Sequence, residues 1–453
     1  MRVAPSASTI RYDMSGMISP RNESAERVLT DYARPLEQGR RTLLEQRKRG
    51  EIGWLDLPMD KAMIKRVQKV VAKTKKFQTL LVLGIGGSDL GARAILQALG
   101  QGSKKSVRFA GANTDPDELE AVLKDIIWKK TVVNIISKSG DTVEPMSAFL
   151  VVRERLRKAV GKKFAQQIVA TTDAKKGTLH DLAEEEGYHQ LIVPQNVGGR
   201  FSVLSDVGLF PAAFAGIAIK EMLAGAAEQV RVFEKDPVDF QPAAQYAGLH
   251  ADWFQRHRAN VWVLMPYSAH LELFGRWYRQ LIAESLGKKK NRNALTIEIG
   301  PTPVAALGAT DQHSQIQLYM EGPHDKVITF IEIEKFRSRL RVSPLVGEVL
   351  HERRGGSHIS VQTLERFATL VNVPFEELIH AERKATAEAL TSVKRPNATI
   401  TLPKLDAYHL GALFQMFMIA TAYLGELFNI DPYNQPGVEE GKKRFKMWLE
   451  NRG

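Results

Sequence analysis

Two glycine-containing loops in the first half of the sequence have the composition of phosphate-binding sites. They span residues 84–91 and 137–142, and each lies between an apolar run typical of a strand and a run typical of a helix. Backbone N–H groups and hydroxyls at a helix start bind a phosphate dianion. The standard dinucleotide and nucleotide motifs are ruled out by Asp89 and by Ala92-Arg93, which stand where those motifs need glycine and Lys-Ser or Lys-Thr. The loops therefore favour a phosphate without a nucleotide, although a turn with a helix N-cap explains either loop alone.

Three charged residues further along the chain are of types that transfer protons or stabilise negative charge. Arg200 follows two glycines and keeps its charge, so it suits a developing oxyanion. Glu284 stands among apolar residues of a helical run, surroundings that favour a general base. His313 lies in a polar stretch after a strand-like run. Taken singly, each has a plainer explanation: a surface ion pair for Arg200, an ion pair with Lys288 for Glu284, and a structural role for His313.

Length and composition limit the class of protein. The chain has 453 residues, and at about 150 residues per domain this suggests two or three domains. The hydrophobic share of 44% and the charged share of 25% are typical of a globular protein and exclude a disordered or low-complexity chain. The sequence has no cysteine, which excludes disulfides, thiolate zinc sites and a cysteine nucleophile and indicates a reducing compartment. A net charge of +12 suits either a polyanion or small phosphorylated substrates.

Several binding partners are not indicated. No HExxH pair occurs among the histidines, so we expect no metal site. The basic clusters at residues 40–41 and 288–290 lack interleaved aromatic residues, and we expect a solvated charged face and no nucleic acid. The apolar run at residues 410–425 is shorter than the roughly 18 residues of a membrane span, which predicts a buried helix and no membrane. The first 20 residues lack the apolar core of a signal peptide, and we expect a cytoplasmic protein.

Alternating strand and helix patterns must position these residues. We expect strands at residues 79–83, 132–136, 168–170, 191–193, 261–265, 295–299 and 327–333. We expect helices within residues 24–66, interrupted near Pro35 and Pro58, and at 89–99, 145–156, 182–186, 210–226, 270–285, 361–370, 407–428 and 441–453. Such alternation predicts an α/β fold with mainly parallel sheets and ligands beyond the carboxyl ends of the strands.

Six motifs, in this order, resemble the glucose-6-phosphate isomerase (phosphoglucose isomerase) family. They are LGIGGSDLG at 83–91, ISKSGDTVEP at 136–145, NVGGRFS at 196–202, AESLGK at 283–288, GATDQHSQ at 308–315 and GELFNIDPYNQPGVEEGK at 425–442. The resemblance covers about residues 40 to 445, and the length is similar to that of the shorter bacterial members. Two positions depart from the pattern: Asp141 stands where many members have threonine, and Leu286 where asparagine is frequent.

The resemblance implies a fold, an assembly and a reaction. It implies two αβα-sandwich sugar-isomerase (SIS) domains at residues 46–235 and 236–430, an N-terminal helical segment at 1–45 and a C-terminal helical tail at 431–453. It implies a homodimer with active sites at the subunit interface. The implied reaction is the reversible conversion of glucose 6-phosphate to fructose 6-phosphate, a step of glycolysis and gluconeogenesis. It proceeds by ring opening and an enediolate, with no cofactor.

The resemblance also implies roles for particular residues. Glu284 would be the proton shuttle and Arg200 would stabilise the enediolate, which agrees with the chemistry of their side chains. His313 and Lys442 would assist ring opening, with His313 supplied by the partner subunit. The expected substrate-binding residues are Gly87, Ser88, Ser137, Lys138, Ser139, Thr142, Gly199, Gln280 and Gln435.

Two other functions fit part of the sequence. A non-catalytic sugar-phosphate sensor would use the same phosphate loops, but it would give Glu284, His313 and Lys442 no reason to occur together. Such a sensor would also be expected to carry a helix-turn-helix segment, which we do not find. An isomerase that accepts mannose 6-phosphate as well would share every motif, and the sequence does not distinguish it.

Overall fold

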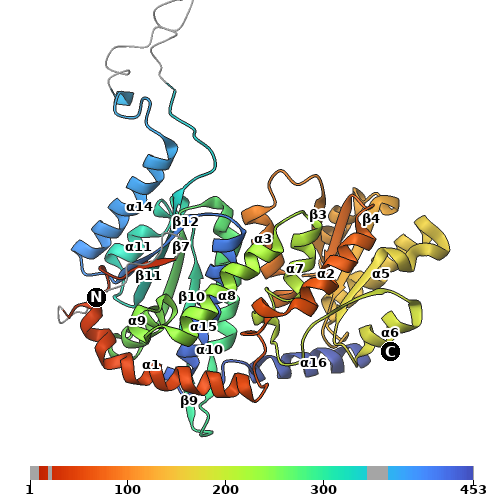
Figure 1. The fold of residues 1–453 in the computed structure, drawn as a ribbon, viewed down its shortest axis with the longest axis horizontal. Coiled ribbons are helices and arrows are strands. Elements are labelled where there is room, and N and C mark those ends of the chain that lie inside the picture. Colours follow the sequence, from red (N-terminus) through yellow and green to blue (C-terminus); the bar gives the residue numbers. More distant parts are fainter. Residues whose placement is uncertain (1–9, 19–22, 344–365, 452–453) are drawn as a thin grey trace, which may run out of the picture.

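The computed structural model describes residues 10–18, 23–343 and 366–451, and within them the chain forms two α/β halves that lie side by side (Figure 1). The first half contains a five-stranded sheet in the order β3-β2-β4-β5-β6, with every neighbouring pair parallel. Its strands are β2 (Thr79–Leu83), β3 (Ser106–Ala110), β4 (Thr131–Ile136), β5 (Ile168–Thr172) and β6 (His189–Ile192). All six residues of β4 are buried, as expected for a central strand with helices on both faces.

Helices cover both faces of this first sheet (Figure 1). They are α2 (Lys61–Thr74), α3 (Leu90–Leu99), α4 (Pro116–Lys124), α5 (Val143–Val160), α6 (Thr178–Glu186) and α7 (Asp206–Phe214). The loop at residues 84–91 joins β2 to α3, and the loop at residues 137–142 joins β4 to α5. Because β2 and β4 are parallel neighbours, both loops leave the same carboxyl edge of the sheet.

The second half contains a five-stranded sheet in the order β1-β12-β11-β7-β10, parallel except for β1. Its strands are β1 (Arg11–Asp13), β7 (Val261–Pro266), β10 (Thr302–Ala305), β11 (Lys326–Lys335) and β12 (Asn397–Lys404). The helices around it are α1 (Ala25–Lys48), α8 (Ile219–Lys235), α9 (Pro242–His257), α10 (Glu272–Leu286), α11 (Ile316–Glu321), α14 (Phe375–Ser392) and α15 (Ala407–Leu427). The two sheets confirm the predicted α/β class with mainly parallel strands.

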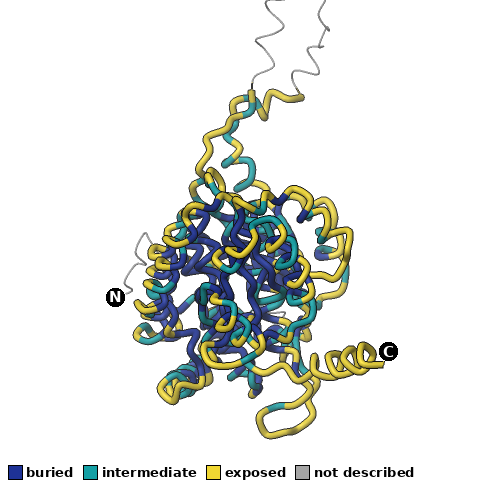
Figure 2. Tube along the Cα trace, turned by 90° about the vertical axis from the view of Figure 1, so that its right-hand side faces the viewer, coloured by how far each residue is buried: buried dark blue, intermediate teal, exposed yellow. Residues whose placement is uncertain are grey.

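Helix α15 lies at the centre of the hydrophobic core of the second half. It packs along α8 and also contacts α1, α9 and α10. By length and composition α15 is the one helix of the described segments that is apolar enough to cross a membrane, but 89% of that apolar window is buried inside the fold. The burial supports the predicted core helix, and Figure 2 shows buried residues through the interior of the molecule.

Two elements project from this body (Figures 1 and 2). The first is an antiparallel ribbon of β8 (Lys288–Lys290) and β9 (Thr296–Ile299), and the second is helix α16 (Glu439–Glu450). Helix α16 has no buried residue and exposes Phe445, Met447 and Leu449. Helix α16 thus leaves large apolar side chains at the surface of the described chain.

Two helix predictions are corrected by the structure. Helix α1 continues through Pro35, because the buried apolar face of α1, which includes Leu29, Tyr32 and Leu36, holds the helix together on both sides of the proline. The single helix predicted at residues 210–226 is instead the end of α7 and the start of α8. The break lies at Gly216, whose φ of +86° is outside the helical range.

Strand predictions failed where the sequence pattern was weak. Residues 295–299 form a strand only in the exposed β8–β9 ribbon and not in the parallel sheet. Strands β1, β3, β10 and β12 were not predicted, because they are short or contain proline and threonine in place of an apolar run. The helix predicted at 361–370 falls largely outside the described residues.

Candidate active site

Arg200 is held in a buried position at the junction of the two halves. It lies in the 3-10 turn Gly199–Phe201, and its side chain is only 2% exposed. Nε donates to Ser285 Oγ at 2.8 Å, and Nη2 donates to the carbonyl oxygens of Pro432 and Asn434 at 2.5 and 3.0 Å. Burial lowers the pKa of Arg200, and the nearby Glu284 carboxylate partly offsets this. The guanidinium is therefore fixed before any ligand arrives.

The remaining nitrogen of Arg200 faces two functional side chains. Nη1 lies 3.4 Å from Glu284 Oε2 and donates to Gln435 Oε1 at 3.0 Å. Glu284 stands in the last turn of α10, its side chain is 33% exposed, and its Oε1 accepts a 3.0 Å hydrogen bond from Gln280 Nε2. The structure thus brings together four residues that the sequence predicted: Arg200, Gln280, Glu284 and Gln435.

The surroundings of Glu284 differ from those expected. Its helical neighbours Leu281 and Ile282 are buried in the core, whereas its carboxylate meets Arg200 and Gln280. The expected ion pair with Lys288 is wrong, because the Lys288 ammonium donates to the backbone carbonyl of Glu284. Glu284 is therefore a partly exposed carboxylate beside one fixed cation.

The loop at residues 137–142 is ordered by its own hydroxyls. Ser137 Oγ accepts from the Gly140 N–H at 3.1 Å and donates to Thr142 Oγ1 at 3.3 Å, and Ser139 Oγ accepts from the Asp141 N–H at 3.2 Å. These contacts hold the hydroxyls and amides of the loop at the start of α5, where a phosphate binds favourably. The loop retains the form of an anion site although Asp141 lies within it.

Two charged residues of this loop point away from its hydroxyls. Asp141 Oδ1 accepts from Thr178 Oγ1 at 2.9 Å, so its carboxylate is turned toward α6. Lys138 Nζ donates to the carbonyl oxygens of Gln195 and Val197 at 2.8 and 3.3 Å, and burial lowers its pKa. The Lys138 side chain therefore connects the loop at residues 137–142 to residues 195–197, which lead to Arg200.

The first glycine loop touches the Arg200 turn directly. A Cβ on Gly87 would lie 2.1 Å from the carbonyl carbon and oxygen of Gly199, so no side chain fits at Gly87. Ser88 ends a 3-10 turn in this loop, and Asp89 does not cap α3 through its side chain. Asp89 is instead buried and pairs with Arg93 at 2.6 Å, and burial raises its pKa to about 6. The loop is thus fixed by a buried ion pair on one side and by the Arg200 turn on the other.

We expect Gly87→Ala to destabilise the protein because its methyl group overlaps the backbone of the Arg200 turn. A forced backbone shift of this kind costs about 1–3 kcal/mol. The matched variant is Gly199→Ala, whose Cβ meets only Gly87 Cα at 4.0 Å. Thermal unfolding of both variants measures the effect: a lower Tm is expected for Gly87→Ala alone, and equal Tm values would contradict the close approach.

Two predicted catalytic residues lie apart from this cluster. His313 is exposed at the end of the 3-10 turn Thr310–Gln312, and Lys442 is exposed on α16 with its Nζ 2.9 Å from Glu439. Within the part of the chain that the structure describes, no hydrogen bond or ion pair joins either residue to Arg200 or Glu284. The predicted roles of His313 and Lys442 are therefore not supported by a side-chain contact with the Arg200 cluster in the described chain.

Several residues of the cluster were not identified from the sequence. Ser285 orients Arg200, Lys288 binds two carbonyl oxygens, and the carbonyls of Pro432 and Asn434 receive the guanidinium. All four stand inside motifs quoted above, next to residues with predicted roles. Their position beside those residues was the available signal, but a backbone carbonyl is present at every position and cannot be singled out from residue type.

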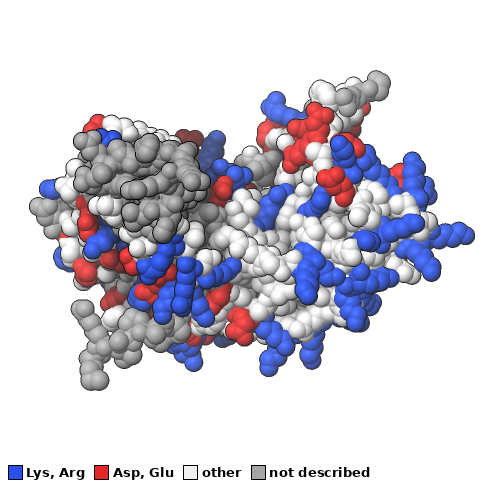
Figure 3. All heavy atoms as spheres, turned by 90° about the horizontal axis from the view of Figure 1, so that it is seen from above, with Lys and Arg blue, Asp and Glu red and all other residues white. Residues whose placement is uncertain are grey.

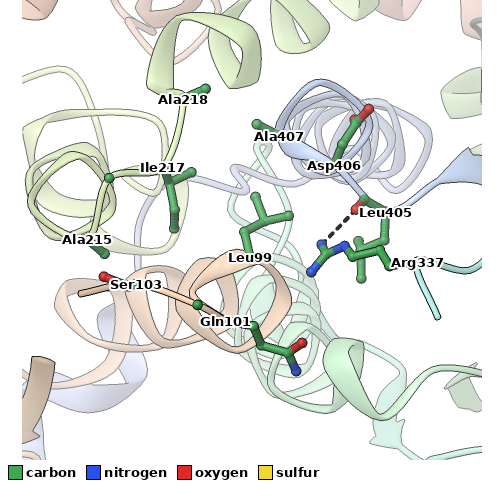
Figure 4. Close-up of a pocket in the computed structure, with 12 residues that line it drawn as sticks. Leu99, Gln101, Ser103, Ala215, Ile217, Ala218, Arg337, Leu405, Asp406 and Ala407 are labelled. Atoms are coloured by element: carbon green, nitrogen blue, oxygen red, sulfur yellow. Dashed lines mark hydrogen bonds between the residues drawn. The ribbon is translucent and has the colours of Figure 1, made fainter. Parts of the chain in front are cut away.

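A separate hollow lies between the two halves (Figure 4). It has a volume of about 330 Å³ and is lined by residues that include Leu99, Ile217 and Leu405. Arg337 donates to the carbonyl oxygens of Ala98 and Leu405 at 3.0 and 2.7 Å and so joins the halves at this point. No residue of the Arg200 cluster lines the hollow.

The charged side chains are unevenly distributed over the surface. Figure 3 shows Lys and Arg side chains gathered over the upper face of the first half, with few Asp or Glu between them. Among the residues described, no group of three or more His, Asp or Glu side chains is placed to hold a metal ion. Arg200 and Lys288 carry positive charge within the cluster itself.

Comparisons with known proteins place the chain among its relatives. A family model described as phosphoglucose isomerase matches residues 61–451. The chain is 40% identical over 423 residues to a glucose-6-phosphate isomerase of Carboxydothermus hydrogenoformans, which covers 91% of this chain and 88% of the relative. A hypothetical protein, TT0462, from Thermus thermophilus superposes with a TM-score of 0.85 at 32% identity, over 97% of this chain and 100% of that one. A glucose-6-phosphate isomerase from Chlamydia trachomatis shares the fold, with a TM-score of 0.73 at 24% identity over 86% and 72% of the two chains.

Proposed function

The chain belongs to the phosphoglucose isomerase family, and on this premise we propose that it interconverts glucose 6-phosphate and fructose 6-phosphate. The observation that carries the proposal is the contact between Arg200 and Glu284, a buried fixed cation 3.4 Å from a partly exposed carboxylate. An aldose and its ketose differ by a proton moved between C2 and C1, which needs one base and one cation beside it. The hydroxyl-rich loop at residues 137–142, in the half that carries Arg200, would bind the phosphate.

We assign each step to a side chain. Glu284 removes the proton from C2, holds it as a carboxylic acid and returns it to C1. Arg200 stabilises the negative oxygen of the enediolate between these two transfers. Gln280 and Gln435 bind sugar hydroxyls, and Gly87 and Gly199 provide backbone beside them. The phosphate lies at Ser88, Ser137, Ser139 and Thr142, near Lys138. No cofactor enters this scheme.

Ring opening requires a second acid and base pair, for which we propose His313 and Lys442. Both are exposed, and in the described chain neither forms a hydrogen bond or ion pair with Glu284, so we propose that a homodimer completes the site and that His313 comes from the partner. The apolar residues exposed on α16 support an assembly of this kind. We further propose that the protein works in the cytoplasm and that the units at residues 46–235 and 236–430 are its two SIS domains, with α8 at the end of the first unit packed on α15 of the second.

The assay that tests the function uses the purified protein with fructose 6-phosphate. A coupled dehydrogenase detects glucose 6-phosphate, and EDTA is present throughout. Turnover supports the isomerase. Absence of turnover with sugar-phosphate binding retained in calorimetry would favour the sensor instead, and mannose 6-phosphate in the same assay measures how wide the specificity is.

A shared active site predicts that two inactive variants restore activity when combined. Glu284→Gln and His313→Ala would each be inactive as homodimers. A mixed dimer contains one site of two with both native residues, so the isolated mixed dimer should have about half of the native activity, and a randomly paired mixture about a quarter. Co-expression with two different affinity tags isolates the mixed dimer. If the mixed dimer were as inactive as its parents, His313 would not be supplied by the partner.

A further inference from the structure

The three consecutive lysines after α10 differ sharply in their surroundings. Lys288 is only 7% exposed, whereas Lys289 and Lys290 are exposed. The expectation of a solvated charged face therefore holds for the second and third lysines and is wrong for the first. A buried ammonium is costly unless it is hydrogen-bonded, so its partners are informative.

Lys288 closes the end of the helix that carries Glu284. Helix α10 ends at Leu286, Gly287 follows, and the chain then turns into β8. The last carbonyls of a helix lack intrahelical partners. Lys288 Nζ donates to one of them, the carbonyl oxygen of Glu284, at 2.6 Å. A cation at this end also interacts favourably with the helix dipole, so the ammonium stabilises the turn from which the Glu284 side chain projects.

The same ammonium reaches the segment that carries Gln435. Lys288 Nζ donates to the carbonyl oxygen of Asn434 at 2.9 Å. Arg200 Nη2 donates to this same oxygen at 3.0 Å, so both lone pairs of the carbonyl are used. The next residue is Gln435, whose side-chain oxygen accepts from Arg200 Nη1. The buried cations Arg200 and Lys288 thus bind the same carbonyl oxygen, that of Asn434.

We propose that Lys288 is a positioning residue, which acts through the carbonyls of Glu284 and Asn434 to fix Glu284 and Gln435 relative to Arg200. It does not contact the reacting atoms in this assignment. The proposal rests on the isomerase function proposed above. Displacement of reacting groups by about 1 Å costs about a hundredfold in rate, so positioning of this kind has a measurable effect.

The charged groups that face Lys288 come from several elements. Arg200 lies in its own 3-10 turn, Glu284 on α10, and Asp431 in the turn after α15. Burial, together with repulsion from Arg200, lowers the pKa of Lys288 to about 8, while Asp431 and Glu284 act in the opposite direction. The ammonium is therefore charged below about pH 8, and above it the neutral amine has one donor fewer and no charge.

The test compares Lys288→Met with Lys289→Met, its exposed neighbour. We expect Lys288→Met to lower kcat by about tenfold to a hundredfold with KM within about twofold, because phosphate binding is untouched. We also expect kcat of the native protein to fall above about pH 8 and this fall to be absent from Lys288→Met. Lys289→Met should retain native kcat, KM and pH profile.

Other outcomes would overturn the assignment. Lys288→Met with native kcat, or with a change in KM alone, would show that Lys288 does not position the base. If Lys288→Met fails to fold, Lys288→Gln takes its place: its amide can still donate to a carbonyl but carries no charge, and native kcat in that variant would contradict the proposal. An inactive native protein in the same assay would instead mean that the proposed function fails.

Discussion

Glu284→Gln should abolish nearly all turnover while leaving the phosphate site intact. The amide has the shape of the carboxylate but cannot accept and return a proton, so kcat is expected to fall on the order of 10³-fold, in the middle of the range for a general base. The amide keeps one of the two side-chain oxygens that accept from Arg200 and Gln280, so one of these two hydrogen bonds is retained. Calorimetry with a non-isomerisable sugar phosphate should give a Kd close to that of the native protein.

The matched control is Glu272→Gln at the other end of α10. Glu272 is exposed and pairs only with Arg276 in the described segments, at 3.3 Å. Its substitution should change neither kcat nor Kd, because the residue is about three helical turns away from Glu284. A Glu284→Gln protein that retains native kcat would show that another group moves the proton, and the assignment of the base would be withdrawn.

Arg200→Lys is the second substitution with a large expected effect. The guanidinium forms its hydrogen bonds in several directions at once, and an ammonium cannot reproduce this planar arrangement. Loss of one fixed donor to a developing oxyanion costs about 10²–10³ in kcat. Because the carbonyls of Pro432 and Asn434 lose a buried partner, stability should fall by about 1–3 kcal/mol as well.

Urea unfolding and steady-state kinetics measure these two effects separately. Arg276→Lys provides the control, since Arg276 is exposed and its contact with Glu272 is a surface ion pair worth about 0.2–1 kcal/mol at most. An Arg200→Lys protein with native kcat would contradict the role of Arg200 beside the enediolate. Native stability with reduced kcat would show that the carbonyls find other donors.

The sequence pattern predicted the central strands of both sheets, because each is a continuous apolar run. The apolar runs that became β2, β4 and β7 are continuous because these strands are covered on both faces. The same runs predicted that the loops at residues 84–91 and 137–142 lie at the carboxyl ends of strands. Breaks and extensions of helices were less predictable, because burial carried α1 through Pro35 while a single residue, Gly216, ended the helix predicted at 210–226.

The tertiary contacts of the site could not be derived from spacing. Gly87 and Gly199 are far apart in the sequence. Only the folded chain shows that the Gly199 backbone leaves no room for a Cβ on Gly87. In the same way, three adjacent lysines look identical in the sequence, and the turn after α10 buries only the first. The roles of His313 and Lys442 stay predictions, because they depend on the homodimer that we propose.

The most direct test of the account follows the proton itself. The native protein and Glu284→Gln would each be incubated with fructose 6-phosphate in D₂O, and the products followed by proton NMR. Glu284 is partly exposed, so its acquired proton exchanges with solvent. The account predicts that the native protein forms glucose 6-phosphate with deuterium in part of the C2 positions and that Glu284→Gln forms almost none. Failure of the native protein to form glucose 6-phosphate, or equal labelling by both proteins, would contradict it.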